Sequence, residues 1–73
     1  MNPPVTVHPL GADGGRRVSV RTAGETHILG IAYNDRDVIE FLRRAGLDDP
    51  EQLLDDSGWV RWRGGRPHEW LAA

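Results

Sequence analysis

The spacing of the apolar residues changes once along this chain, just after Tyr33. Before that point, apolar residues alternate with polar ones in "VTVHPL" (5–10) and "RRVSVRT" (16–22), and run almost continuously in "THILGIAY" (26–33). Alternation is typical of a half-buried strand, and a short continuous apolar run is typical of a central strand. Because glycine-containing turn segments separate the three runs, the first half of the chain predicts a three-stranded antiparallel meander.

The following residues, 35–45, have the apolar spacing of a helix. This spacing is set by Val38, Ile39, Phe41, Leu42 and Ala45. Asn34 or Asp35 can cap the start, because a short side-chain oxygen accepts a hydrogen bond from an unpaired backbone N–H. Gly46 can adopt the left-handed conformation that ends a helix. Both ends of the predicted helix are therefore marked in the sequence.

The last third of the chain predicts a second, short helix and a hairpin. Asp49 followed by Pro50 is a helix-start signal, and this helix should end near Asp56. The segments "WVRWR" and "PHEWL" (59–71) then flank a Gly-Gly pair, which suits the positive φ angles of a tight turn. The complete order is βββααββ, and it predicts an α+β fold with both helices packed on one face of an antiparallel sheet.

The length of 73 residues predicts one small domain, 1–73, in which residues 1–4 are expected to be loose. A domain of this size buries only about 60% of the surface that its unfolded chain exposes. Since the chain has no cysteine, neither a disulfide nor a cysteine-based zinc site can stabilise it. We expect its core to contain at least one tryptophan and the following apolar residues: Val5, Val7, Val18, Val20, Ile28, Ile31, Val38, Phe41, Leu42, Leu53 and Leu54.

Charge is distributed unevenly along the chain, although the net charge is only −2. Residues 34–58 carry three arginines against eight acids, whereas residues 59–73 carry three arginines against Glu69 alone. Such a polarity can steer a charged partner without identifying it. No stretch approaches the roughly 20 apolar residues of a membrane span, and the first residues lack the pattern of a signal peptide. We therefore expect a cytoplasmic protein with no membrane partner.

The stretch "GWVRWRGGRPHEW" (58–70) holds all three tryptophans and is the main candidate for a binding surface. A two-residue Gly-Gly turn pairs Trp59 with Trp70 on the arginine face, which makes a surface able to stack single-stranded bases and contact phosphates. A one-residue shift instead pairs Arg61 with Glu69 and buries two tryptophans, as a small core requires. The pattern leaves both registers open. The candidate binding residues are Trp59, Arg61, Arg63 and Arg66, extended by Arg17 and Arg21 if the second strand neighbours the hairpin.

Other candidate sites lack the spacing that their chemistry requires. His8, His27 and His68 are scattered and have no partner ligand in their own segments, so we expect no metal site and no cofactor. The acids of "LDDPEQLLDD" (47–56) do not follow the pattern of a calcium loop, although they leave open a weak docking surface for an arginine-rich partner. No motif frames a serine or threonine with a histidine and an orienting acid, so we expect no enzymatic activity.

These features favour a non-enzymatic binding or accessory domain. The leading hypothesis is a protein-interaction module, in one version a homodimer joined through an exposed strand edge or Trp59. The alternative is weak nucleic-acid binding through the hairpin rich in tryptophan and arginine. The arginines of that patch belong to an acidic chain, and they fall below the usual basic signature of a nucleic-acid-binding domain.

Overall fold

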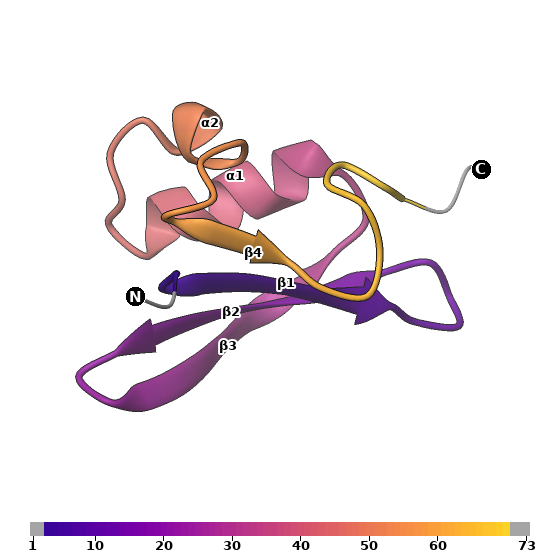
Figure 1. Cartoon of the computed structure of the whole chain (residues 1–73), viewed down its shortest axis with the longest axis horizontal. Helices are drawn as coiled ribbons and strands as arrows, with labels where there is room; N and C mark the ends of the chain where they lie inside the picture. Colours follow the sequence, from indigo (N-terminus) through magenta and orange to yellow (C-terminus); the bar gives the residue numbers. More distant parts are fainter. Residues whose placement is uncertain (1–2, 71–73) are drawn as a thin grey trace.

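The computed structural model describes residues 3–70. Four strands form one sheet: β1 (Val5–Leu10), β2 (Arg16–Thr22), β3 (Glu25–Ala32) and β4 (Val60–Trp62). Two helices, α1 (Asp35–Arg44) and α2 (Pro50–Leu53), lie together on one side of this sheet (Figure 1). The predicted α+β class is therefore confirmed.

The sheet is mixed, with the strand order β3-β2-β1-β4. Strands β1, β2 and β3 form the predicted antiparallel meander. Strand β4, however, pairs in parallel with β1, with Val5 opposite Val60 and Val7 opposite Trp62. Parallel strands need a crossover connection, and the chain supplies it through the two helices between β3 and β4. The prediction of a purely antiparallel sheet in the order βββααββ was wrong.

The predicted C-terminal hairpin does not form within the described residues, so neither register that the sequence left open exists there. Only Val60–Trp62 is a strand, and residues 63–70 continue as a loop. Two backbone features disfavour a second strand: His68 has a φ of 61°, and Pro67 has no N–H to donate. Gly64 does have the positive φ of a turn residue, 66°. The last residue of the predicted second strand, 71, lies outside the described residues.

Helix α1 has the predicted ends. The Asn34 side chain accepts a hydrogen bond of 2.9 Å from the N–H of Asp37. At the other end Gly46 has a φ of 91°, and the N–H of Leu47 donates to the carbonyl of Leu42 at 3.1 Å. This bond is the long-range bond of a Schellman motif, which ends a helix by satisfying its last carbonyls. Helix α2 is shorter than predicted and does not reach Asp56.

The start of the chain is partly held by the sheet. Residues 1 and 2 of the segment expected to be loose lie outside the described residues. The carbonyl of Pro4 accepts a hydrogen bond of 2.7 Å from the N–H of Arg21, and the N–H of Val5 donates to the carbonyl of Trp59 at 3.0 Å. Pro4 is therefore tied to β2, next to the first residue of β1.

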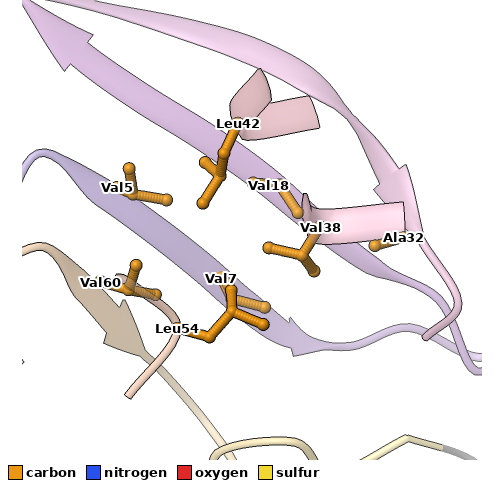
Figure 2. Close-up of a cluster of buried hydrophobic side chains, with 8 residues drawn as sticks. All are labelled: Val5, Val7, Val18, Ala32, Val38, Leu42, Leu54 and Val60. Atoms are coloured by element: carbon orange, nitrogen blue, oxygen red, sulfur yellow. The ribbon is translucent and has the colours of Figure 1, made fainter. Parts of the chain in front are cut away.

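The core lies between the helices and one face of the sheet. Figure 2 shows its eight buried side chains pointing into this space: Val5, Val7, Val18, Ala32, Val38, Leu42, Leu54 and Val60. Six of the residues predicted for the core are among them. Val20, Phe41 and Leu53 are partly buried against it, as are Trp62 and Trp70. The core was predicted to contain at least one tryptophan, but Trp62 and Trp70 are only partly buried and pack against it.

Ile28 and Ile31 were predicted for the core but are 58% and 49% exposed. The reason is a bulge in β3: Val18 pairs with Gly30 and Ser19 pairs with Ile28, which leaves one extra residue between the two pairs. The extra residue places both isoleucines on the face away from the helices. Gly30 permits this arrangement, because a Cβ atom there would lie 2.7 Å from the ring of Phe41.

A buried arginine replaces the hairpin as the group that holds the C-terminal loop. Arg16 is fully buried, and its guanidinium donates to backbone carbonyls from two parts of the chain. The acceptors are His8 at 2.8 Å and Arg63, Arg66 and Glu69 at 3.0 Å each. The guanidinium carbon also lies 5.2 Å from the ring centre of Trp62 and 5.8 Å from that of Trp70, within cation–π range. Burial lowers the pKa of Arg16, and the charge of Glu69 partly opposes this shift.

His68 links the same loop to the helical layer. Its Nδ1 lies 2.6 Å from a carboxylate oxygen of Asp35 at the start of α1, and its Nε2 lies 2.5 Å from one of Asp55. The indole N–H of Trp70 donates to the other oxygen of Asp35 at 2.8 Å. Hydrogen bonding to Asp55 and Asp35 raises the pKa of His68 above its ordinary value of 6.5.

We expect His68 to make stability depend on pH. Because its pKa is raised in the folded state, its contribution is fully present below pH 6.5 and is lost as pH rises through the folded-state pKa. The free energy of unfolding lost in His68→Gln should therefore be larger at mildly acidic than at alkaline pH, as measured by urea denaturation. The control is His27→Gln, since His27 lies at the surface 3.9 Å from Glu25. Equal losses for His68→Gln at both pH values would contradict this expectation.

Candidate functional site

The face of the sheet away from the helices gathers residues from all four strands. Since alternate residues of a strand point to opposite faces, the neighbours of the buried valines point away from the core. We call this side the open face. Its members on the strands are Thr6, His8, Arg17, Ser19, Arg21, Thr26, Ile28, Ile31 and Arg61. Three of the six candidate binding residues, Arg17, Arg21 and Arg61, lie on it.

Strand pairing arranges the open face in cross-strand rows. Thr6 pairs with Arg61 on one side and with Ser19 on the other, and Ser19 pairs in turn with Ile28. The next row is fixed by pairing of Arg21 with Thr26. β1 lies between β2 and β4. The second strand is therefore not a direct neighbour of the segment that holds the tryptophans, which was the condition for adding Arg17 and Arg21 to the candidate surface. Across β1, Arg61 of β4 lies in the row of Ser19, and Arg17 and Arg21 lie two residues to either side of Ser19 on β2.

A shallow hollow of about 200 Å³ lies on the open face and brings these arginines together. Arg21, Arg61 and Arg63 all line it. Arg63 is the first residue after β4, and its N–H donates to the carbonyl of Val7 at 2.8 Å, which continues the parallel pairing. The uncharged side chains around the arginines are Thr6, Ser19 and Thr26, with Pro3 and Pro4 at one end. The hollow is thus lined by cationic groups and hydroxyls.

His8 and Ser19 lie at the floor of this hollow. The Nε2 of His8 is 2.9 Å from the hydroxyl oxygen of Ser19, which is only 4% exposed. Burial, and after it the positive charges of Arg63 and Arg17, lowers the pKa of His8 from its ordinary value. The two arginines therefore flank His8 closely enough for their field to act on it.

The pair of His8 and Ser19 resembles two members of a catalytic triad, but the third is missing. A nucleophilic serine needs a histidine that an acid orients. Among residues 3–70, no carboxylate hydrogen-bonds His8. Ser19 is also nearly inaccessible to a substrate. The pair is better explained as two polar side chains on adjacent strands that satisfy each other's hydrogen-bonding groups.

Asp13, in the turn between β1 and β2, places a carboxylate beside the open face. It lines a second hollow of about 280 Å³ together with Arg17 and Ile31. Its two oxygens are already used, because the hydroxyl of Tyr33 donates to one at 2.8 Å and the N–H of Gly15 to the other at 3.1 Å. These bonds, that of Tyr33 above all, lower the pKa of Asp13. Asp13 therefore brings a negative charge to the Arg17 end of the face.

The remaining candidate residues do not join this surface. Trp59 is 41% exposed and precedes β4 at the edge of the sheet, and the Arg66 side chain is 88% exposed in the loop that follows. Trp62 and Trp70 pack around Arg16 on the other side of the sheet. The predicted continuous surface of tryptophan and arginine is therefore not assembled. The prediction for these residues was built on a hairpin that does not form.

Sequence reasoning missed His8, Ser19 and Ile28 as members of the site. Alternation along β1 and β2 was sufficient to place the first two on the same face as Arg17 and Arg21. Ile28 had no such signal, because its side depends on the bulge in β3.

Comparisons with known proteins add no relative to this picture. No protein-family model, curated protein or solved structure matches the chain. Across residues 3–70, no group of three or more histidine, aspartate or glutamate side chains is placed to hold a metal ion, and no helix is long and apolar enough to cross a membrane. A function has to be inferred from the open face itself.

Proposed function

We propose that this chain is a non-enzymatic protein-interaction module that docks a partner protein through the open face of its sheet. The observation that supports this most is the composition of that face. It combines the arginines of β2 and β4 with two isoleucines, Ile28 and Ile31, that are 58% and 49% exposed beside them. Apolar side chains next to arginine are typical of the part of an interface that carries most of the binding energy. A cytoplasmic location stays a prediction.

The partner that fits this face is acidic. The open face and the hollow carry Arg17, Arg21, Arg61 and Arg63, whereas residues 34–58, which include both helices, have three arginines against eight acids. A second copy docked by the same face would oppose identical arginines, and facing like charges are unfavourable. A homodimer through a sheet edge or Trp59 stays a separate prediction.

Binding of single-stranded nucleic acid is the second candidate, because the four arginines share one region. Such binding also uses aromatic side chains, on which the bases stack. No described aromatic side chain other than His8 lines the 200 Å³ hollow, and Trp62 and Trp70 are occupied with Arg16. This difference makes an acidic protein segment the better match.

The proposed function can be tested with a displayed library of random peptides selected on the wild-type protein. We expect the selected peptides to be acidic and to carry aliphatic residues. Arg21→Glu and Arg61→Glu should each weaken their binding by about tenfold or more, because a like charge then faces the peptide. Arg36→Glu is the matched control: it makes the same charge change on the exposed first turn of α1, where an acid is favourable.

The outcome that would overturn the proposed function is equal binding to all four proteins, or selected peptides that are basic. Basic peptides would place the interaction on the acidic helical layer. The sequence left open such a docking surface for an arginine-rich partner on the segment 47–56. Circular dichroism of each variant checks that the fold is intact.

A further inference from the structure

The hollow on the open face has a more specific composition than a general basic patch. Three arginines, Arg21, Arg61 and Arg63, line it together. The threonines Thr6 and Thr26 line the hollow with them and add hydroxyl groups, whereas the hydroxyl of Ser19 is already bonded to His8. These residues come from all four strands and the residue just after β4, so a rigid sheet fixes their relative positions.

The number of positive charges decides between two kinds of anionic group. Within the described residues, none of the nine that line the hollow is acidic. A carboxylate offers one charge and two oxygens, which one arginine can satisfy with two parallel hydrogen bonds. A phosphoryl group on a side chain carries about −1.5 to −2 charges and three acceptor oxygens at pH 7. Three arginines with hydroxyl donors therefore match a phosphoryl group better than a carboxylate.

His8 lines the same hollow, with its Nε2 2.9 Å from the hydroxyl oxygen of Ser19. Burial lowers the pKa of His8, and the positive charges of Arg63 and Arg17 lower it further. The positive charge on this side of the sheet disfavours a charged imidazole and favours an anionic ligand.

The hollow is also connected to an apolar surface. Ser19 at its floor pairs directly with Ile28, whose side chain is 58% exposed, and Arg17 pairs with Ile31. A free phosphate ion would make no use of these isoleucines. A peptide that carries a phosphorylated residue and flanking aliphatic side chains would cover both features together.

We propose that the hollow binds the phosphoryl group of a phosphorylated serine or threonine in a segment of the partner protein. Arg21, Arg61 and Arg63 contact the phosphoryl oxygens, and Ile28 and Ile31 contact aliphatic residues beside the modified one. A short phosphorylated side chain suits a hollow that is shallow and has no tyrosine, tryptophan or phenylalanine among its described lining residues. This inference rests on the proposed function, because it names the chemistry of the partner on the same face.

The test uses a short acetylated peptide with a central phosphoserine between isoleucines, and versions with glutamate or serine at the centre. Isothermal titration calorimetry should give binding to the phosphoserine peptide at least about tenfold tighter than to the glutamate version. Arg61→Ala and Arg21→Ala should remove most of this difference, whereas Arg36→Ala on α1 should keep it. The His8 ring should report the event in NMR, because a bound dianion raises its pKa.

Three results would overturn the inference. Equal affinity for the phosphoserine and glutamate peptides would rule out specific recognition of a phosphoryl group but leave a docking face for acidic peptides. Inorganic phosphate that binds as tightly as the phosphopeptide would show a site for the free ion. Oligouridylate that binds more tightly than the phosphopeptide and displaces it would move the site to nucleic acid. If displayed acidic peptides also fail to bind, the proposed function fails with the inference.

Discussion

Replacement of Arg16 by methionine is expected to lower the free energy of unfolding by about 3 kcal/mol or more. Hydrogen bonds to a charged group contribute about 1.5–3 kcal/mol each, and this guanidinium makes four of them to carbonyls. Part of the loss is recovered when the loop 63–70 detaches and its carbonyls bind water. Stabilities of about 0.05–0.15 kcal/mol per residue are usual, so this loss is a large fraction of the total for 73 residues.

Urea denaturation followed by tryptophan fluorescence measures this effect. Trp62 and Trp70 pack on the guanidinium of Arg16, so the fluorescence of the folded variant should already differ from that of the wild type. Arg17→Met is the matched control, because Arg17 is the next residue on β2 and its side chain is exposed on the open face. An exposed substitution of this kind should change stability by about 0.5 kcal/mol or less. Similar losses for both variants would contradict the role of Arg16.

Truncation of Leu42 is the second large effect. Leu42 is fully buried in the core, so Leu42→Ala should cost about 2–5 kcal/mol through lost apolar burial and the cavity left behind. Ile28→Ala removes a similar aliphatic side chain from the open face, where 58% of it is exposed. It should cost well under half as much. Thermal denaturation by circular dichroism compares the two.

This pair of variants tests which face of the sheet is buried. Ile28 was predicted for the core on its apolar character alone, and the structure moves it to the other face. A cost for Ile28→Ala equal to that of Leu42→Ala would restore the sequence-based placement and remove the open face as a docking surface. A small cost together with weaker peptide binding would support its proposed role at the interface.

Local signals explain why much of the fold was predictable. The ends of α1 depend on Asn34 and Gly46, which act on neighbouring backbone groups. The alternation of apolar and polar residues in β1 and β2 depends only on the fact that adjacent residues of a strand point to opposite faces. The pairing of β4 with β1 joins residues far apart in sequence. The buried Arg16 likewise binds acceptors that lie up to 53 positions away. The Gly-Gly pair suggested a hairpin through its turn chemistry alone. No local feature of the sequence reveals that the distant guanidinium of Arg16 binds the carbonyls of the loop that follows.

The candidate site was predictable to the extent that it follows alternation. Arg17, Arg21 and Arg61 were candidate residues on two separate strands, and the structure brings them to one face. Trp59 and Arg66 depended on the hairpin register and therefore did not join them. Ile28 and Ile31 depended on the bulge at Gly30, which is fixed by the packing of Phe41 over the strand and not by the apolar pattern.

The measurement that tests the central claim most directly is an amide chemical-shift map of labelled protein titrated with a selected acidic peptide. If the open face is the docking surface, the shifts should concentrate on β1, β2 and β3 around Thr6, Ser19 and Ile28 and on the guanidinium signals of Arg21 and Arg61. They should weaken as salt is added, because exposed charges are screened. Shifts concentrated on α1 and α2, with the open face unchanged, would contradict the account.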